Sequence, residues 1–479
     1  MFLRLFFTIA VVAWSGVSFS QQVVFQTGKV YALFNFAQTI SGNPHRSQTL
    51  KDYFDQSKFN DAPTKAAISE FAEVAKVFRK SWEFDEYPAK RFMDQSLGSI
   101  FLIQATYSKD LKDLSQRTEG LLPLSLHKRL FNALAIIEPI YDELVWNPST
   151  KGLLEYETKV KELARRVNVN AMYDKTKAFY GAEWPSETPF VVSLYPIPGT
   201  KGEAPGESTE TVESVAVLVG RPADPGKVAD VFGVAFHEMS HSIFRAQPAE
   251  FQNKIDKYFK NSTSKFAGLA YRYANEAVAT VVGNVWAFKK ATGKMLEGKW
   301  YGHPIIDAYA KEIYPVIEPY IESGKRMDQA LIDRMIVSFE RRLGDTLLDY
   351  TSIFDEIKLL SDKVHMTNFR PAAQKYFRIR EIGRSSLDGY QGGDSSAPLV
   401  VLFLEKDYEQ VEKLSHQFKA ISPHLKVLKE ERKVIVSLVD ENQRPFILIK
   451  LNSSADINLA LEKLSSEGKI KPDSPVIRY

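Results

Sequence analysis

The sequence contains no cysteine among its 479 residues. This absence excludes a disulfide scaffold, a zinc site built from thiolates, a cysteine nucleophile and a lipid anchor attached to cysteine. Histidine is scarce, with eight in the whole chain. The charges nearly cancel, because 62 basic and 59 acidic residues leave a formal net charge of +3. That balance gives no sign of nucleic acid or of an anionic membrane as the main partner.

Long apolar runs are missing beyond the first twenty residues. Met1–Arg4 is short and basic, Leu5–Trp14 is apolar, and Ser18–Ser20 offers small residues for cleavage before Gln21. This order is typical of an export signal. The apolar stretch is shorter than the roughly 20 residues that span a bilayer, which favours cleavage over the alternative of a retained anchor. We therefore expect a signal peptide at 1–20 and an exported mature protein, periplasmic or extracellular, with no membrane span.

Two of the histidines fall in one pentad, His237–His241 (HEMSH), inside a predicted helix. Asp224 suits the N-cap of that helix and Pro225 suits its first position. Histidines four residues apart project from the same side of a helix, so both imidazoles can reach one ion. Glu238 lies about 100° further round, where it can touch a water on that ion without ligating it. This is the layout of a zinc hydrolase, and the alternative is an amphipathic helix whose histidines hydrogen-bond within the core.

A second predicted helix, Phe266–Lys289, carries the sequence Asn-Glu-Ala-Val-Ala beginning 34 residues after His241. Catalytic zinc needs a third protein ligand, and Glu276 in this stretch can supply a carboxylate from a neighbouring helix. The small alanines beside it allow the two helices to approach closely. Thr280, one turn beyond Glu276, is placed to hydrogen-bond the back of a ligand histidine.

The pattern His-Glu-x-x-His followed by Asn-Glu-x-x-Ala resembles the signature of the gluzincin metallopeptidases over roughly residues 185–290. The opening segment after the leader is also similar to an uncharacterised family of secreted bacterial gluzincin-like proteins. The resemblance implies that His237, His241 and Glu276 ligate Zn²⁺, with the glutamate between the histidines as general base. The chain departs from the family in two ways. Its gap between the second histidine and the third ligand is longer than in many gluzincins, and Thr280 stands where some carry an aspartate.

Hydrolysis of a peptide at zinc forms a tetrahedral oxyanion, and a hydrogen-bond donor must be waiting for it. The resemblance implies a His or Tyr downstream of the third ligand. His303, at a predicted junction between loop and helix, is the first candidate for this catalytic role, and Tyr301 is the second. The alternative for either residue is a packing role.

Strands are predicted at Pro189–Ile197 and Glu213–Val219, just before the helix that carries the pentad. The segment between them, 198–212, is rich in Gly, Pro, Ser, Thr and Glu and is predicted to be a loop. In the zincin arrangement that the motif implies, an edge strand above the active-site helix pairs with an extended peptide. One of the two predicted strands is the candidate for that edge.

The whole chain is predicted to have an α+β fold with a zincin-like catalytic domain, mostly helical with a small sheet beside the active-site helix, and a small C-terminal α/β domain. A strand is expected at Val23–Phe36. The predicted divisions are a catalytic domain at 21–385, with a helical N-terminal lobe at 60–180, a zinc-site core at 185–290 and a helical part at 300–385, then a linker at 386–398 and an accessory domain at 399–479. The accessory domain contains no catalytic cluster and is expected to bind a protein partner.

The sequence therefore predicts a secreted zinc metallopeptidase acting on peptide or protein substrates. One alternative is a non-catalytic envelope protein that keeps the zinc helices as structure and acts through its C-terminal domain. Glu238 argues against it, because a purely structural site does not need a base. A further alternative is a zinc hydrolase of a non-peptide amide, such as a cell-wall cross-link, which the motif does not separate from proteolysis.

Overall fold

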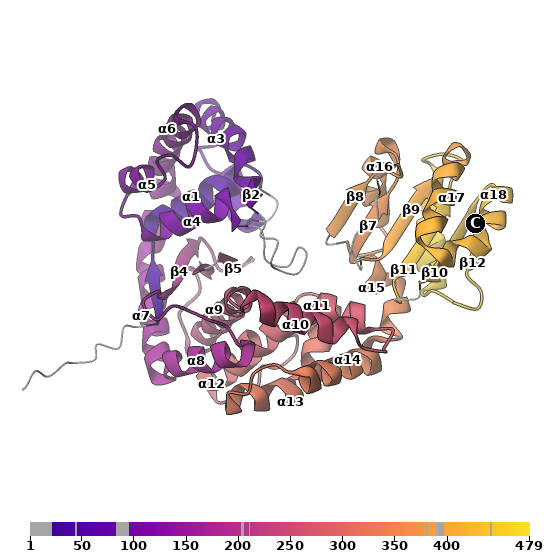
Figure 1. The fold of residues 1–479 in the computed structure, drawn as a ribbon. Helices are drawn as coiled ribbons and strands as arrows, with labels where there is room; N and C mark the ends of the chain where they lie inside the picture. The colour runs from indigo at the N-terminus through magenta and orange to yellow at the C-terminus, as the bar shows by residue number, and fades with distance from the viewer. Residues whose placement is uncertain are drawn as a thin grey trace, which may run out of the picture.

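The computed structural model describes residues 22–43, 46–82, 95–202, 206–209, 211–379, 381–388, 390, 397–440 and 443–479. Figure 1 shows a helical lobe in indigo and purple, a second helical group in magenta to orange, and a C-terminal sheet in orange to yellow. The signal peptide predicted at 1–20 lies outside the described residues. Within them, the structure contains no helix with the length and apolar character needed to cross a membrane.

The N-terminal lobe is built around α1 (Lys29–Ile40), in which every residue from Val30 onward is buried. A helix buried on all sides belongs at the centre of a core. The prediction of one strand over Val23–Phe36 is therefore wrong beyond Thr27, because periodicity does not separate a buried strand from a buried helix in a short apolar run. The other elements of the lobe are α2 (Gln48–Asp55), α3 (Ala62–Ala75), η1 (Lys76–Arg79), β2 (Ser81–Trp82), β3 (Gln95–Ser96), α4 (Leu97–Tyr107), α5 (Leu111–Arg117) and α6 (Leu124–Tyr141).

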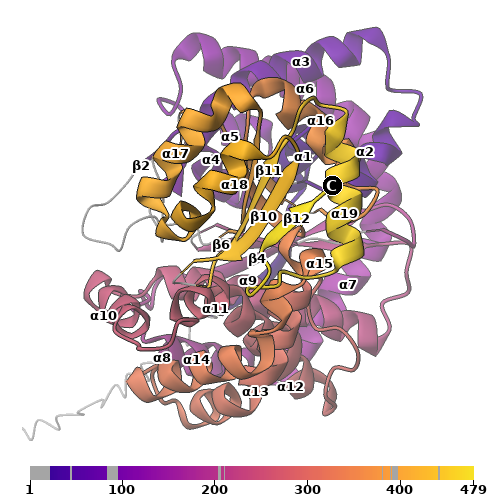
Figure 2. The same ribbon diagram turned by 90° about the vertical axis from the view of Figure 1, so that its right-hand side faces the viewer.

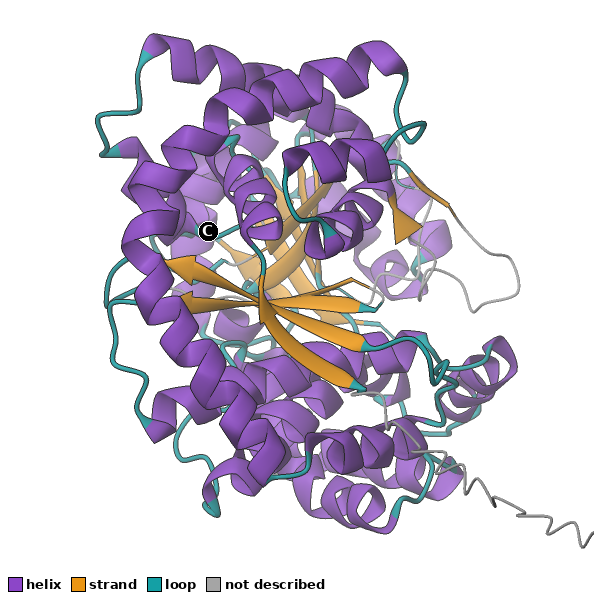
Figure 3. Ribbon diagram, turned by 90° about the vertical axis from the view of Figure 1, so that its left-hand side faces the viewer, coloured by secondary structure: helices purple, strands orange, loops and turns teal. Residues whose placement is uncertain are grey.

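A four-stranded sheet lies between this lobe and the second helical group (Figure 3). Alternate residues of a strand point to opposite faces. In strand β4 (Phe190–Ile197), Tyr195 and Ile197 pack in the core of the N-terminal lobe, whereas Val192 and Leu194 pack in the core of the second helical group. The first three strands run parallel and the last is antiparallel, in the order β1 (Val23–Thr27), β4 (Phe190–Ile197), β6 (Val212–Leu218) and β5 (Gly206–Thr209).

The strands predicted at Pro189–Ile197 and Glu213–Val219 are confirmed as β4 and β6, but both are interior strands. The prediction that one of them forms the edge is wrong for β4 and for Val212–Val215 of β6, the part that pairs with β5, whereas 216–218 of β6 have no partner on that side within the described residues. The edge beside the pentad helix is β5, which lies inside the segment 198–212 that the sequence predicts as a loop. The sequence of β5, Gly-Glu-Ser-Thr, has no apolar residue and gives no strand pattern. This segment is a strand because it pairs with β6.

The second helical group packs on the other face of this sheet around one apolar core. The helix predicted at Phe266–Lys289 is present as a continuous run that includes a π-helical segment, η3. The π-helical segment η2 (Asp142–Trp146) joins the two groups, and its buried Val145 belongs to the core of the N-terminal lobe. The elements of the second group are α7 (Asn147–Arg166), α8 (Val169–Tyr180), α9 (Pro225–Arg245), α10 (Ala249–Lys260), α11 (Ala267–Ala279), η3 (Thr280–Ala287), α12 (Phe288–Thr292), α13 (Pro304–Ser323) and α14 (Gln329–Leu343).

The C-terminal region contains a six-stranded mixed sheet with helices on both faces (Figure 2). Its strands, in spatial order, are β12 (Val476–Arg478), β10 (Val434–Val439), β11 (Pro445–Lys450), β9 (Leu399–Phe403), β7 (Glu356–Leu360) and β8 (Glu381–Ser385). One face is covered by α15 (Tyr350–Ile353), α16 (Lys363–Ala373) and α19 (Asp456–Glu467), and the other by α17 (Tyr408–Gln417) and α18 (Leu425–Glu430). Short 3₁₀ helices are η4 (Thr346–Leu348), η5 (Glu405–Asp407) and η6 (Lys419–His424).

The C-terminal sheet begins before the segment predicted as a linker. Strands β7 and β8 come from the part predicted as the helical end of the catalytic domain, and β7 pairs in parallel with β9. The predicted linker at 386–398 therefore connects two strands of one sheet, and the predicted boundaries at 300–385 and 399–479 are wrong there. A polar connection between strands has the composition of a linker, so local sequence does not separate the two.

Candidate metal centre

The pentad His237–His241 lies in helix α9, whose N-terminus is capped. The Asp224 side chain accepts a hydrogen bond from the backbone N–H three residues on, and Pro225 occupies the first turn, as predicted. His237 and His241 lie one turn apart on the same side of α9, and their Nε2 atoms are 3.2 Å apart. Their side chains are 8% and 12% exposed. The two imidazoles therefore face one point at the edge of the core.

The second helix crosses α9 where two glycines meet. Gly283 lies in η3, and a Cβ built there would lie 2.2 Å from the backbone N of His237 and 2.6 Å from the carbonyl O of Gly233. No side chain fits in that space, so glycine permits this close approach of the two backbones. The crossing brings Glu276, near the end of α11, opposite the two histidines. The sequence predicts a close approach through small alanines, and Gly283 is the residue at which the backbones touch.

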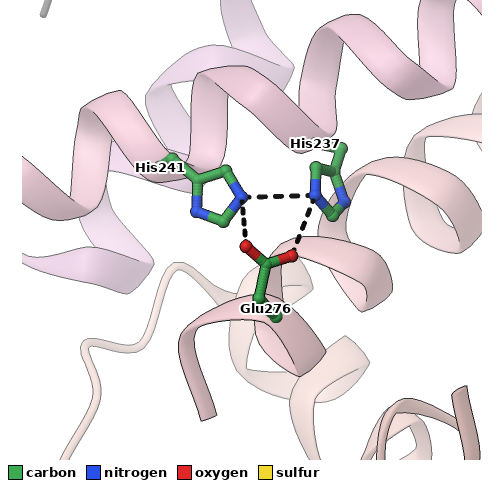
Figure 4. Close-up of side chains that lie close together, drawn as sticks. All are labelled: His237, His241 and Glu276. Atoms are coloured by element: carbon green, nitrogen blue, oxygen red, sulfur yellow. Dashed lines mark hydrogen bonds and ion pairs between the residues drawn. The ribbon is translucent and has the colours of Figure 1, made fainter. Parts of the chain in front are cut away.

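The three predicted metal ligands converge in the structure, as Figure 4 shows. The Nε2 atom of His237 is 3.5 Å from one oxygen of Glu276, and the Nε2 atom of His241 is 3.4 Å from the other. The Glu276 side chain is 38% exposed, so the group opens to solvent on its side. Three donor atoms that surround one point can hold a metal ion, and the open side leaves a position for water or substrate.

Asn275 orients one of the ligands. Its amide oxygen Oδ1 lies 3.3 Å from Nδ1 of His241. An amide oxygen only accepts hydrogen bonds, so Nδ1 of His241 donates and its Nε2 presents a lone pair to the centre. The prediction gave this kind of role to Thr280. That prediction is wrong, because Thr280 is fully buried and its hydroxyl makes no hydrogen bond within the described residues.

The charge states of the three groups suit metal binding. Burial opposes the charge of Glu276, but the hydrogen bond from His237 and the nearby histidines lower its pKa to about 2. Burial lowers the pKa of His241 to about 4, although Glu276 acts in the other direction. Burial also opposes protonation of His237, but Glu276 and Glu238 outweigh it and raise its pKa. At neutral pH the centre thus offers a carboxylate and at least one neutral imidazole, which are the forms that bind a metal.

Glu238 lies against the edge strand β5. A Cβ built on Gly206 would lie 2.7 Å from Oε1 of Glu238, so the bare backbone of Gly206 makes room for this carboxylate. Glu213 on β6 is buried, and neither of its carboxyl oxygens has a hydrogen-bond partner within the described residues. Burial, with the negative charge of Glu238, raises the pKa of Glu213 well above its ordinary value. The neutral form of Glu213 is therefore favoured beside Glu238.

Tyr301 reaches the centre and His303 does not. The Tyr301 ring stacks on His237 with 5.7 Å between ring centroids, and its hydroxyl hydrogen-bonds Glu276. His303 is buried, its Nδ1 accepts a hydrogen bond from the backbone N–H two residues on, and its Nε2 lies 3.2 Å from Oδ2 of Asp355. Both of its ring nitrogens are engaged by partners other than the three donor atoms, so the geometry does not support His303 as the first candidate donor. Tyr301, the second candidate, is the one at the site.

The C-terminal sheet contacts the centre through the start of β7. Arg272 lies one turn before the ligand on α11 and forms an ion pair with Glu356, the first residue of β7. Asp355, the residue before it, is buried and faces His303 at the beginning of α13. Two consecutive acidic residues thus tie both the ligand helix and the Tyr301 loop to the C-terminal sheet.

A groove lies beside α9, on the N-terminal side of Glu238. It has a volume of about 190 Å³ and lies between the N-terminal half of α9 and the edge of β6. Strand β5 covers only Val212–Val215 of that edge, so 216–218 have no strand partner on this side within the described residues. The lining is mostly apolar and includes Val231 and Val234. Val234 lies one turn before Glu238 on α9, so one lining residue of the groove is a helical turn from the pentad.

None of the protein-family models, curated proteins or solved structures compared with this chain matches it. The centre is therefore interpreted from its own geometry.

Sequence reasoning gave no role to Asn275, Gly206, Glu213 or Gly283. Three of these had a local signal, since Asn275 opens the Asn-Glu-x-x-Ala pattern, Glu213 is an acidic residue in a buried strand and Gly283 interrupts an apolar helix. Gly206 had none, because its contacts depend on residues far away in the chain.

Proposed function

We propose that this protein is a zinc-dependent hydrolase that cleaves peptide bonds. One observation carries the proposal: the donor atoms of His237, His241 and Glu276 lie 3.2, 3.4 and 3.5 Å from one another. Ligands about 2.0–2.2 Å from a tetrahedral zinc ion are separated by roughly 3.3–3.6 Å. Two imidazoles and one carboxylate with an open fourth position are a known ligand set of catalytic zinc. The donor set and its spacing thus fit zinc.

A bound zinc ion supplies an acidified water and polarises the scissile carbonyl. The residues of the chain do the rest. Glu238 accepts the proton of that water and passes it to the leaving amine. The hydroxyl of Tyr301, already at the centre through its hydrogen bond to Glu276, donates to the oxyanion. Asn275 holds His241 in the tautomer that ligates through Nε2.

A peptide substrate is supported by the groove and the free strand edge. An extended peptide can pair with an exposed edge through its backbone, while pockets receive alternate side chains. The free edge at 216–218 is on the same side of β6 as its pairing with β5, and Gly206 of β5 lies beside Glu238. The apolar lining at Val231 and Val234 favours an apolar side chain on the substrate. The basic and apolar pattern of residues 1–20 supports export, so we propose extracellular or periplasmic proteins as substrates.

The proposal is tested by replacing Glu238 with Gln in the zinc-loaded protein. The variant keeps all three ligands and the shape of the side chain, so it should bind zinc normally. Its turnover of any peptide that the wild type cleaves should fall by on the order of 10²–10⁴-fold, because the general base is lost. Glu250→Gln, an exposed change on the next helix, is the matched control and should leave turnover unchanged.

Cleavage is followed by mass spectrometry of a broad peptide library, with the zinc content of each protein measured in parallel. A zinc-loaded wild type that cleaves no peptide, or a Glu238→Gln variant as active as the wild type, would contradict the proposed hydrolase. Cleavage of a non-peptide amide with the same dependence on Glu238 would keep the chemistry and replace the substrate class.

A further inference from the structure

The C-terminal sheet contains a second cavity, built from elements other than those that form the metal centre. Its volume is about 180 Å³, and its lining comes from the start of α15, from β10 and β12, and from the end of α19 with the segment that follows. Figure 2 shows β10, β12 and α19 at the front of the C-terminal sheet. Pockets for drug-sized ligands measure about 300–1,000 Å³, so this cavity suits a smaller ligand.

Two buried hydroxyl groups face each other in the lining of this cavity. Tyr350 is fully buried and Ser437 is 1% exposed. The hydroxyl of Tyr350 is directed at Ser437, and neither hydroxyl has any other hydrogen-bond partner within the described residues. Two hydroxyls that have only each other leave one O–H donor without an acceptor, and a buried donor without an acceptor costs free energy, so this couple in a cavity indicates a ligand that accepts a hydrogen bond.

The rest of the lining is rich in positive charge. Lys463 and Lys471 both pair with Glu467, at 3.0 and 2.7 Å, while Lys469 has no ion pair within the described residues. The fourth basic residue, Arg478, pairs with a carboxylate outside the cavity. The three lysines exceed the one carboxylate by two charges. The C-terminus of α19 contributes only about half a negative charge, so an excess of more than one positive charge remains.

We propose that this cavity is a binding site for a small dianionic oxyanion of the phosphate monoester type. Hydroxyl groups donate to phosphate oxygens, and lysines act on phosphate as point charges. The hydroxyl couple would donate its remaining O–H to one phosphate oxygen at the floor, and Lys469 would neutralise the outer charge. The site lies in the C-terminal sheet and does not depend on whether the metal centre is catalytic. It gives that sheet a ligand-binding role besides its contacts with α11 and α13.

Isothermal titration of the full chain with inorganic phosphate tests this site, with chloride at matched ionic strength as the reference ligand. The variants are Ser437→Ala, Tyr350→Phe and Lys469→Gln. Each should weaken phosphate binding by about tenfold or more, since hydrogen bonds to charged groups are the stronger ones. Lys426→Gln is the matched control, because that lysine is exposed in the same region and outside the cavity. It should leave the affinity unchanged.

The result that supports the site is phosphate binding that exceeds chloride binding and weakens in the three cavity variants alone. Phosphate binding no stronger than chloride would overturn the proposal, and so would equal weakening in Lys426→Gln. The Lys469 side chain is exposed, so its replacement does not threaten folding. The phosphate titration of Lys469→Gln therefore decides the question even if Ser437→Ala or Tyr350→Phe is unstable.

Discussion

Replacing Gly283 with alanine should separate the two helices that carry the proposed metal ligands. The added methyl group would lie 2.2 Å from the backbone N of His237, 2.5 Å from its Cα and 2.6 Å from the carbonyl O of Gly233. All three are backbone atoms, so no side chain can rotate away to make room. The helices themselves must move.

The size of the movement follows from ordinary contact distances. A Cβ in van der Waals contact lies 3.4–4 Å from its neighbours, so η3 and α9 must separate by roughly 1.2 Å at Gly283. Overpacking of this kind costs typically about 1–3 kcal/mol of stability. The donor atoms of Glu276 and the histidines are only 3.2–3.5 Å apart, so a shift of that size removes one ligand from the shell. Zinc affinity should fall on the order of 100-fold, since even the loss of an outer-shell partner costs 10–100-fold.

The assay is a competition titration of zinc against a chromophoric chelator, with thermal unfolding measured on the same samples. Gly268→Ala on α11 is the control, because a Cβ there meets nothing within 4 Å. It should raise stability by up to about 1 kcal/mol through helix propensity and leave zinc affinity unchanged. If Gly283→Ala binds zinc as the wild type does, the close crossing does not set the geometry of the centre, and the reasoning fails.

Three further outcomes are expected. Glu276→Gln should weaken zinc binding by at least about tenfold in the same titration, and an unchanged affinity would mean that another residue completes the centre. Glu213→Gln should raise the melting temperature above about pH 5 and flatten its decline with pH. Folding raises the pKa of this carboxyl, so the unfolded chain loses the proton first and stability falls as pH rises; equal pH dependence in both proteins would refute this. A chain ending at residue 389 keeps β7 and β8 without β9, so it should aggregate on size-exclusion chromatography, and a soluble monomer would argue against the observed sheet boundary.

Local sequence was sufficient for the parts of this protein that depend on neighbours along the chain. The cap at Asp224 and the spacing of His237 and His241 follow from helical geometry, which repeats every 3.6 residues. The short apolar runs of β4 and β6 indicate buried strands, because a strand buried on both faces is apolar along its whole length. Glu276 could be proposed as third ligand because its helix and its neighbours are visible in the sequence.

Tertiary contacts decided the rest. Strand β5 exists because β6 offers it a free edge, and its polar sequence carries no strand pattern. Tyr301 and His303 are two residues apart in one loop, yet only the pairing of His303 with the distant Asp355 shows which of them faces His237 and Glu276. The place of β7 and β8 in the C-terminal sheet likewise depends on pairing across a polar connection. These features arise from contacts between residues far apart in the chain, and short-range periodicity does not predict such contacts.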